Sequence, residues 1–310
     1  MINYKSKIFI AGHKGMLGSA ILRVLKRKGY KNLLIIDKKK LDLRNQISVK
    51  KYLKLKRPDA IVIAAAKVGG IKANVDYPAS FIRDNLQIQT NLISSGYDTN
   101  VKKLILFGSS CIYPKDLKRP IKESQILTGA LESTNESYSV AKIAGVKMIE
   151  AFNKQYKTNY ICLMPCNLFG PNDNYDLKNS HFLPALIRKI SAASKKNKIV
   201  RLWGTGKPLR EILYVDEVAE ACEYFLKKKT KNSLINIGSR VEMTIKDYAF
   251  KVKKKIDSKV LIKFDNNIKL DGVKRKKLDI SLAARYGWRD KMNFSKALDR
   301  TIEDFNNSFK

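Results

Sequence analysis

The chain has few cysteines, few histidines and no long apolar run. Its 310 residues include four cysteines and two histidines, and these form neither a Cys-x-x-Cys pair nor a set of metal ligands. We therefore expect reduced thiols, a cytoplasmic location and no structural metal. No apolar stretch approaches the roughly 20 residues of a membrane span, and the first residues show no signal peptide. The sequence predicts a protein without a membrane partner.

Acidic residues are also scarce. Only 28 aspartates and glutamates face 62 lysines and arginines, so the formal net charge is +34. Such a charge alone would favour a nucleic-acid partner through phosphate neutralisation. The lysines are spread over every segment, however, and form no single arm or nucleic-acid-binding module. We expect no nucleic-acid partner, and a lysine-rich surface that attracts small anionic substrates.

Short apolar strands alternate with helical spacing through the first half of the chain. Strands are predicted at 7–11, 33–36, 60–65, 103–107 and 161–164, with helices at 19–28, 46–55, 80–94 and 138–156. This alternation predicts an α/β fold built on a Rossmann-type, doubly wound parallel sheet. After Pro171 the alternation loosens, although 199–203 and 234–237 remain strand candidates.

The predicted organisation follows from that change of pattern. We expect a dinucleotide-binding Rossmann domain over 1–170, to which part of 211–240 returns. A smaller C-terminal α/β lobe, mainly 171–310, is expected to bind the substrate.

Three glycines, Gly12, Gly15 and Gly18, follow the first strand and precede the first helix. In this position the first permits a tight turn, the second lets the backbone approach a pyrophosphate, and the third allows close helix packing. Asp37 closes the second strand about twenty residues later, where an acidic residue usually binds a ribose hydroxyl. The spacing Gly-x-x-Gly-x-x-Gly alone is equally compatible with glycines that only form turns. Its placement between a strand and a helix predicts dinucleotide binding.

A second pattern combines Tyr138, Lys142 and Ser109. The tyrosine and lysine lie four apart on a predicted helix, so their side chains share one face. Ser109 follows the strand at 103–107, at the edge of the sheet where ligands bind. Lys142 would lower the pKa of the phenol, and Ser109 would orient a carbonyl group. A surface pair is the alternative, but together with the glycines the set predicts hydride transfer from a nicotinamide cofactor.

Several longer segments resemble one known family. They are 8–15, 64–71, 108–115, 167–171, 179–181 and 203–211. The segments Ala-Ala-Lys-Val-Gly-Gly-Ile and Ser-Ser-Cys-Ile-Tyr-Pro-Lys are much more specific than the glycine loop. By these residues the chain resembles, over almost its whole length, the extended short-chain dehydrogenase/reductases that act on nucleotide sugars. Within that family it is similar to the branch that makes GDP-L-fucose.

The resemblance implies a reaction with two halves. GDP-4-keto-6-deoxy-D-mannose would be epimerised at C3 and C5, and the C4 ketone would then be reduced by NADPH to give GDP-L-fucose. Cys111 and His181 would exchange the epimerisation protons. Tyr138 would protonate O4, beside Ser109 and Lys142. The resemblance also implies a homodimer that pairs through the helices at 80–94 and 138–156.

The expected ligand sites follow the same motifs. The cofactor residues are Gly12, His13, Lys14, Gly15, Met16, Leu17, Gly18, Asp37, Lys38, Asp42, Leu43, Ala64, Ala65, Ala66, Phe107, Gly108, Ser109, Tyr138, Lys142, Pro165, Asn167, Leu168 and His181. The resemblance places the GDP-sugar at Ser110, Asn167, Lys189, Trp203, Arg210, Asp271 and Lys276. Lys189 stands where relatives often have arginine, so the positive charge is kept but the bidentate hydrogen bonding of a guanidinium group to phosphate is lost.

The choice of cofactor divides the two lines of reasoning. The resemblance implies NADPH, whereas Asp37 is placed to bind a ribose hydroxyl and repel a 2′-phosphate. Lys14 and Lys38 would pair with the phosphate instead, so we expect NADP, and NAD use stays open.

Two other functions stay open. One is a C4 reductase of a related GDP-keto sugar, a heptose or deoxy sugar, without epimerisation. The other is a catalytically inactive Rossmann protein that binds nucleic acid, against which the intact set of Ser109, Tyr138 and Lys142 argues.

Overall fold

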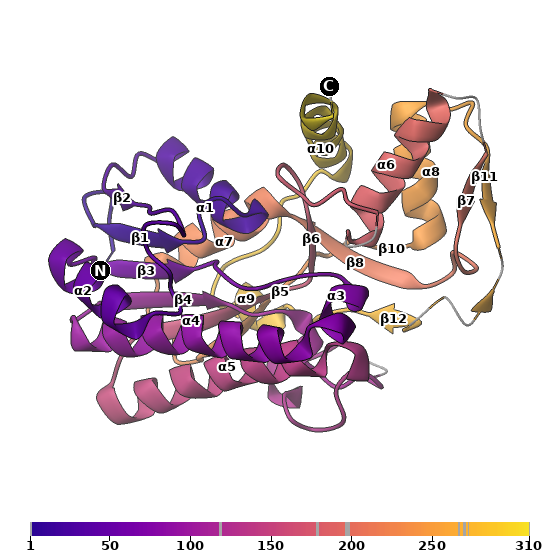
Figure 1. Cartoon of the computed structure of the whole chain (residues 1–310). Helices are drawn as coiled ribbons and strands as arrows, with labels where there is room; N and C mark the ends of the chain where they lie inside the picture. Colours follow the sequence, from indigo (N-terminus) through magenta and orange to yellow (C-terminus); the bar gives the residue numbers. More distant parts are fainter. Residues whose placement is uncertain are drawn as a thin grey trace.

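The computed structural model describes residues 2–117, 120–177, 180–195, 199–265, 267–268, 271 and 273–309. Asn179, which belongs to one of the family-like segments, lies outside these ranges. Figure 1 shows a large sheet flanked by helices and, beside it, a smaller group of helices and strands near the C-terminus.

The strands are β1 Ile8–Ala11, β2 Leu33–Leu34, β3 Ala60–Ile63, β4 Lys103–Phe107, β5 Tyr160–Pro165, β6 Asn167–Phe169, β7 Val200–Leu202, β8 Leu209–Tyr214, β9 Leu234–Ile237, β10 Glu242–Thr244, β11 Ile262–Phe264 and β12 Arg275–Lys276. The helices are α1 Met16–Arg27, α2 Gln46–Lys56, α3 Ile71–Asp76, α4 Pro78–Asp98, α5 Glu136–Tyr156, α6 Phe182–Ser194, α7 Val215–Leu226, α8 Ile245–Ile256, α9 Ser281–Arg285 and α10 Phe294–Ser308.

The main sheet is parallel throughout, in the order β2-β1-β3-β4-β5-β9. Strands β1, β3, β4 and β5 are buried along their whole length, which is why they consist of nearly continuous apolar runs. Helices α4 and α5 pack together along the sheet, and α1 packs against α7 (Figure 1). The predicted Rossmann-type doubly wound α/β fold is confirmed.

The order in which successive strands are added to this sheet reverses at β1. Strand β2 pairs with one side of β1 and β3 with the other, so the switch point lies between β1 and β3. In doubly wound sheets the ligand binds at the carboxyl ends of the strands beside this point.

A second sheet forms around β8. This strand pairs with β10 in antiparallel fashion and with β6 and β12 in parallel fashion. Helices α6, α8 and α10 contribute to a separate apolar core beside it. The carboxylate of Glu211 in β8 accepts hydrogen bonds from Ser239 N at 2.7 Å and Leu278 N at 2.8 Å. Because the buried Glu211 joins three segments, it fixes the second sheet against the chain that leaves β9.

Some element boundaries differ from the predictions. The strand predicted at 33–36 ends at Leu34, and the strand predicted at 60–65 ends at Ile63. Past Ile63, Ala64 N still donates to Ala11 O at 3.0 Å, but the backbone of Ala65 then packs against Gly12 and the ladder stops. The short helices α3 and α9 have no counterpart in the predictions. In the described part of the chain, no helix is long and apolar enough to cross a membrane, and all four cysteines are buried free thiols.

The glycine loop is held by backbone-to-backbone packing. Gly12 has a φ of +91°, and a Cβ there would lie 2.6 Å from Ala65 N. A Cβ on Gly18 would overlap the carbonyl oxygen of Gly12, whereas one on Gly15 would meet that oxygen at an ordinary 3.6 Å. Gly18 thus lets α1 approach the loop itself, and Gly15 leaves open space at the start of the helix.

These contacts predict opposite effects for two alanine substitutions. Gly18→Ala should lower the free energy of unfolding by about 1–3 kcal/mol or more, because its neighbours are backbone atoms that cannot move aside cheaply. Gly15→Ala should leave it within about 0.5 kcal/mol of the wild type. Chemical denaturation of the three proteins checks this, and equal stability of both variants would contradict the packing described.

Candidate active site

A cavity of about 620 Å³ opens at the carboxyl ends of the main strands. Its volume lies within the range of small-molecule and cofactor sites, about 300–1,000 Å³. The glycine loop, the segments that follow β2, β3 and β4, the junction of β5 with β6, and the start of α5 all contribute to its lining. Every residue of the expected cofactor site lines this cavity.

Ser109, Tyr138 and Lys142 come together at one end of the cavity. Ser109 follows β4, and the other two lie in the first turns of α5. The Lys142 ammonium group donates to Phe107 O at 2.9 Å and lies 5.8 Å from the centroid of the Tyr138 ring. The Tyr138 phenol is hydrogen-bonded to Ser109. The predicted set therefore forms one cluster.

Burial governs the protonation of this cluster. It raises the pKa of Tyr138, the nearby Cys111 raises it further, and the hydrogen bond with Ser109 acts in the opposite direction. Burial also lowers the pKa of Lys142. We expected Lys142 to lower the pKa of the Tyr138 phenol. Among the protein's own groups, desolvation dominates and the pKa is raised instead. Tyr138 keeps its proton through the neutral range, as a general acid requires.

Cys111 and His181 approach this cluster from different parts of the fold. Cys111 lies in a short 3₁₀ turn, Ser110–Ile112, and is buried. It does not line the cavity, but it interacts electrostatically with Tyr138 and Lys142. His181 directly precedes α6 and does line the cavity. Although His181 is exposed, the atoms packed around its ring lower its pKa, so the imidazole is neutral.

The expected substrate residues are divided between the cavity and the second sheet. Asn167 lines the cavity, and Ser110 is buried beside Cys111. The side chain of Lys189 lies over Trp203, with its ammonium group 5.1 Å from the ring centroid. Trp203 itself is 74% exposed.

Arg210, Asp271 and Lys276 lie outside the main cavity. Arg210 and Lys276 face each other in the β8–β12 register. The Arg210 guanidinium donates to Val273 O at 2.7 Å. The Asp271 carboxylate accepts from the N–H and the hydroxyl of Thr205, both at 2.7 Å. Asp271 therefore holds its loop to Thr205, next to Arg210 and Lys276, which are both half-buried.

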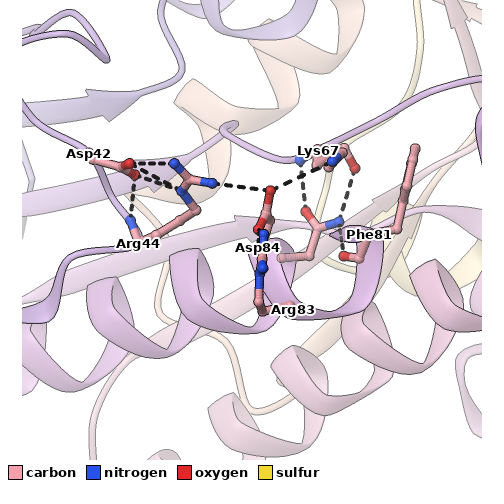
Figure 2. A network of polar contacts seen from close by, with 7 residues as sticks. Asp42, Arg44, Lys67, Phe81, Arg83 and Asp84 are labelled. Atoms are coloured by element: carbon pink, nitrogen blue, oxygen red, sulfur yellow. Dashed lines mark hydrogen bonds and ion pairs between the residues drawn. The ribbon is translucent and has the colours of Figure 1, made fainter. Parts of the chain in front are cut away.

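The sequence analysis missed Arg44, Lys67 and Asp84, three polar residues that line the cavity next to the predicted Asp42. Figure 2 shows Arg44 between the carboxylates of Asp42 and Asp84, with Lys67 on the far side of Asp84. The closest atoms are 2.6 Å apart for Arg44 and Asp42, 3.4 Å for Arg44 and Asp84, and 3.8 Å for Lys67 and Asp84. Arg44 directly follows Asp42 and Leu43, which were predicted to bind the cofactor, and this was the one signal available.

The lining suits a dinucleotide with two phosphates. Gly15 leaves room at the start of α1, whose first turn holds no acidic residue, so the helix N-terminus can face an anion. Lys14 lies beside it and pairs with Asp37 at 2.8 Å, which lowers the pKa of that carboxyl group. Among the described residues, no group of three His, Cys, Asp or Glu could hold a metal ion.

Comparison with known proteins agrees with this geometry. Residues 8–238 match the model of the NAD dependent epimerase/dehydratase family. GDP-L-fucose synthase 1 of Arabidopsis thaliana is 46% identical over 304 residues, which are 98% of this chain and 94% of the relative.

Two solved structures are similar over nearly their whole length. A GDP-L-fucose synthetase of Naegleria fowleri bound to NADP is 26% identical, with a TM-score of 0.92, and the match covers 100% of this chain and 95% of that one. MlghC, a GDP-mannoheptose C4 reductase of Campylobacter jejuni with NADP bound, is 35% identical, with a TM-score of 0.91, over 99% and 100% of the two chains. The chain therefore belongs to the NAD dependent epimerase/dehydratase family.

Proposed function

We propose that this chain is a GDP-L-fucose synthase. It inverts C3 and C5 of GDP-4-keto-6-deoxy-D-mannose and then reduces the C4 ketone in an NADPH-dependent step. The observation that carries the proposal is a single cavity that joins the glycine loop, the cluster of Ser109, Tyr138 and Lys142, and His181, with Cys111 beside Tyr138. Relatives named for this activity match almost the entire chain.

NADP is the cofactor, and its reduced form, NADPH, would supply the hydride that C4 receives. Gly15 and the start of α1 would hold its pyrophosphate, and Lys142 would hold the nicotinamide ribose. Lys14 and Lys38 would meet the 2′-phosphate at the other end of the cavity.

For epimerisation, Cys111 and His181 serve as the proton-exchanging pair. Each stereocentre next to the ketone needs a base on one face and an acid on the other. The lowered pKa of His181 keeps its imidazole neutral, so it can accept a proton. Ser109 and Tyr138 donate hydrogen bonds to the ketone oxygen and so stabilise the enolate that forms.

For reduction, Tyr138 is the general acid. Its raised pKa holds the proton on the phenol until negative charge develops on O4. Lys142, fixed by Phe107 O, lies 5.8 Å from the centroid of the phenol ring as the proton leaves.

The remaining assignments concern the GDP-sugar and the organisation of the chain. Lys189, Trp203, Arg210 and Lys276 would receive the GDP moiety, because guanidinium and ammonium groups suit a diphosphate and an aromatic ring suits guanine. The separate apolar core around β8 supports a lobe, mainly 171–310, next to a Rossmann domain of 1–170 with part of 211–240. We also propose a cytoplasmic homodimer that pairs through α4 and α5.

A second candidate is a C4 reductase of a related GDP-keto sugar without epimerisation. The similarity to MlghC, whose name states such a reduction, favours it. The presence of both Cys111 and His181 favours the first proposal.

The two candidates differ in what happens to the sugar protons in deuterated water. With GDP-4-keto-6-deoxy-D-mannose and NADPH, we expect GDP-L-fucose that carries deuterium at C3 and C5, read by mass spectrometry and proton NMR. Unlabelled GDP-rhamnose would indicate the plain reductase. If the substrate and NADPH both stay unchanged, the proposed function is wrong, and a parallel NADH trial isolates the choice of cofactor.

Replacing Cys111 separates epimerisation from reduction. Cys111→Ser should slow deuterium incorporation by about 10²–10⁴-fold, the usual contribution of a positioned acid or base. C4 reduction should continue and yield a product that is not epimerised. Cys222→Ser is the matched control, since Cys222 is buried in α7 and is not among the groups that act on Tyr138 or Lys142; equal loss in both variants would remove Cys111 from the mechanism.

Replacing Tyr138 should have the converse effect. Tyr138→Phe removes the proton donor for O4, so we expect NADPH oxidation to slow by about 10²–10⁴-fold. Deuterium should still enter at C3 and C5, slowed by a smaller factor than reduction, because Cys111 and His181 remain and Ser109 still donates to the ketone oxygen. Rapid-quench NMR of the sugar together with NADPH absorbance measures both rates, and loss of exchange alone would reverse the assignment.

The dimer can be tested on an exposed face of α5. Ala151→Arg places a large charge in the proposed contact, so sedimentation should shift from dimer to monomer. Ile47→Arg, on the exposed surface of α2, should leave the dimer intact. An unchanged dimer in the first variant would exclude this part of α5 from the contact.

A further inference from the structure

The turn that carries Cys111 is held weakly by its own backbone. Cys111 lies in the 3₁₀ turn Ser110–Ile112, which directly follows the end of β4. Two backbone hydrogen bonds close this turn, one donated by Ile112 N at 3.2 Å and one by Tyr113 N at 3.4 Å. Both are longer than the usual 2.9–3.0 Å of such bonds. The direction of the Cys111 thiol therefore depends on what the turn is fastened to.

The fastening is a buried hydrogen bond just after the turn. The Tyr113 hydroxyl donates to Asn236 Oδ1 at 2.6 Å. Asn236 belongs to β9, two strands away from β4 in the order β4-β5-β9, and lies opposite Met164 of β5. The chain therefore crosses β5 near its carboxyl end before it reaches this anchor, and Cys111 lies on the crossing. Tyr113 is 1% exposed and Asn236 is fully buried, and neither lines the main cavity.

The Asn236 amide can serve Tyr113 in one orientation only. Its Nδ2 donates to Ile121 O at 2.8 Å and to Asp279 O at 3.2 Å. Carbonyl oxygens accept and cannot donate, so Oδ1 must face the tyrosine. The backbone N–H of Asn236 donates to the Glu123 carboxylate at 2.9 Å, on the open side of β9, the last strand of the sheet. Three segments of the chain thus hold Asn236 in place as the seat of the Tyr113 hydroxyl.

Burial also decides what the Tyr113 hydroxyl can do. Desolvation raises the pKa of Tyr113, and the Glu123 carboxylate raises it further, while the hydrogen bond with Asn236 acts in the opposite direction. The phenol therefore keeps its proton and remains a donor. Because it holds its proton and does not reach the cavity, Tyr113 can affect the reaction only through the position of its neighbours.

We propose that Tyr113, seated on Asn236, is a positioning residue for epimerisation, because it fixes the turn from which the Cys111 thiol reaches the sugar. The groups that serve the reduction, Tyr138 and Lys142, project from α5 instead, so reduction depends much less on this turn. The inference rests on the proposed role of Cys111 in epimerisation.

The test compares two rates in Tyr113→Phe, which removes only the hydroxyl. With GDP-4-keto-6-deoxy-D-mannose and NADPH in deuterated water, kcat for deuterium incorporation at C3 and C5 should fall about tenfold, because a small misplacement of a reacting group is costly. NADPH oxidation and the KM of the sugar should change little. An unchanged ratio of exchange to NADPH oxidation would overturn the proposal.

Adding the same substitution to Cys111→Ser separates position from general stability. If Tyr113 acts through the thiol, the double variant should exchange deuterium as slowly as Cys111→Ser alone, since coupled residues are not additive. A further loss of about tenfold in the double variant would show that Tyr113 supports the fold in general, and would overturn the proposal. Asn236→Ala removes the seat and should lower the ratio of exchange to NADPH oxidation in the same direction as Tyr113→Phe.

Tyr160→Phe is the matched control. Tyr160 is also 1% exposed, and its hydroxyl donates to Val101 O at 3.2 Å, but it begins β5, at the end of the sheet away from the cavity. The ratio of exchange to NADPH oxidation should stay at the wild-type value, and an equal fall in both phenylalanine variants would contradict the proposal. A wild type without exchange would overturn the proposed epimerisation together with this inference. A wild type and a Tyr113→Phe variant that exchange equally fast would overturn this inference alone.

Discussion

The backbone contact between Gly12 and Gly18 is the constraint on which the cavity depends. It brings the start of α1 against the turn that leaves β1, and Gly12 in turn meets the backbone at Ala65 after β3. The helix N-terminus is therefore fixed at the switch point between β1 and β3, where the carboxyl ends of the strands leave room for a ligand. A side chain at either glycine would push these segments apart.

The chemistry at the other end of the cavity depends on a different constraint, the desolvation of polar groups. Tyr138 and Lys142 project from consecutive turns of α5 into surroundings that disfavour charge on either group. His181 comes from the chain that leads into α6, and its ring is neutral for the same reason. A neutral acid, a neutral base and an anchored lysine can exchange protons with a substrate without prior rearrangement of charge.

Local patterns were enough to predict the main sheet, the glycine loop and the set of Ser109, Tyr138 and Lys142, because each depends on spacing within one or two elements. Resemblance, not periodicity, nominated His181, which reaches the cavity from beyond the Rossmann strands. The pair of Arg44 and Asp84 joins residues 40 apart through a loop and a helix, and no spacing rule marks it. The raised pKa of Tyr138 was also missed, since burial depends on everything packed around the ring.

Charge acts in two different ways in this protein, through the net charge of the chain and through single ion pairs at the cavity. The chain has 62 basic and 28 acidic residues, and its net charge of +34 attracts any anionic ligand over a distance set by the salt concentration. This attraction acts equally on cofactors and substrates of similar charge. Asp37, Asp42 and Asp84 instead each fix a cation at a defined position. NADP and NAD share their rings and their pyrophosphate and differ by one phosphate at the ribose. Discrimination between them therefore requires groups at fixed positions beside that ribose, and the net charge of the chain contributes little to it.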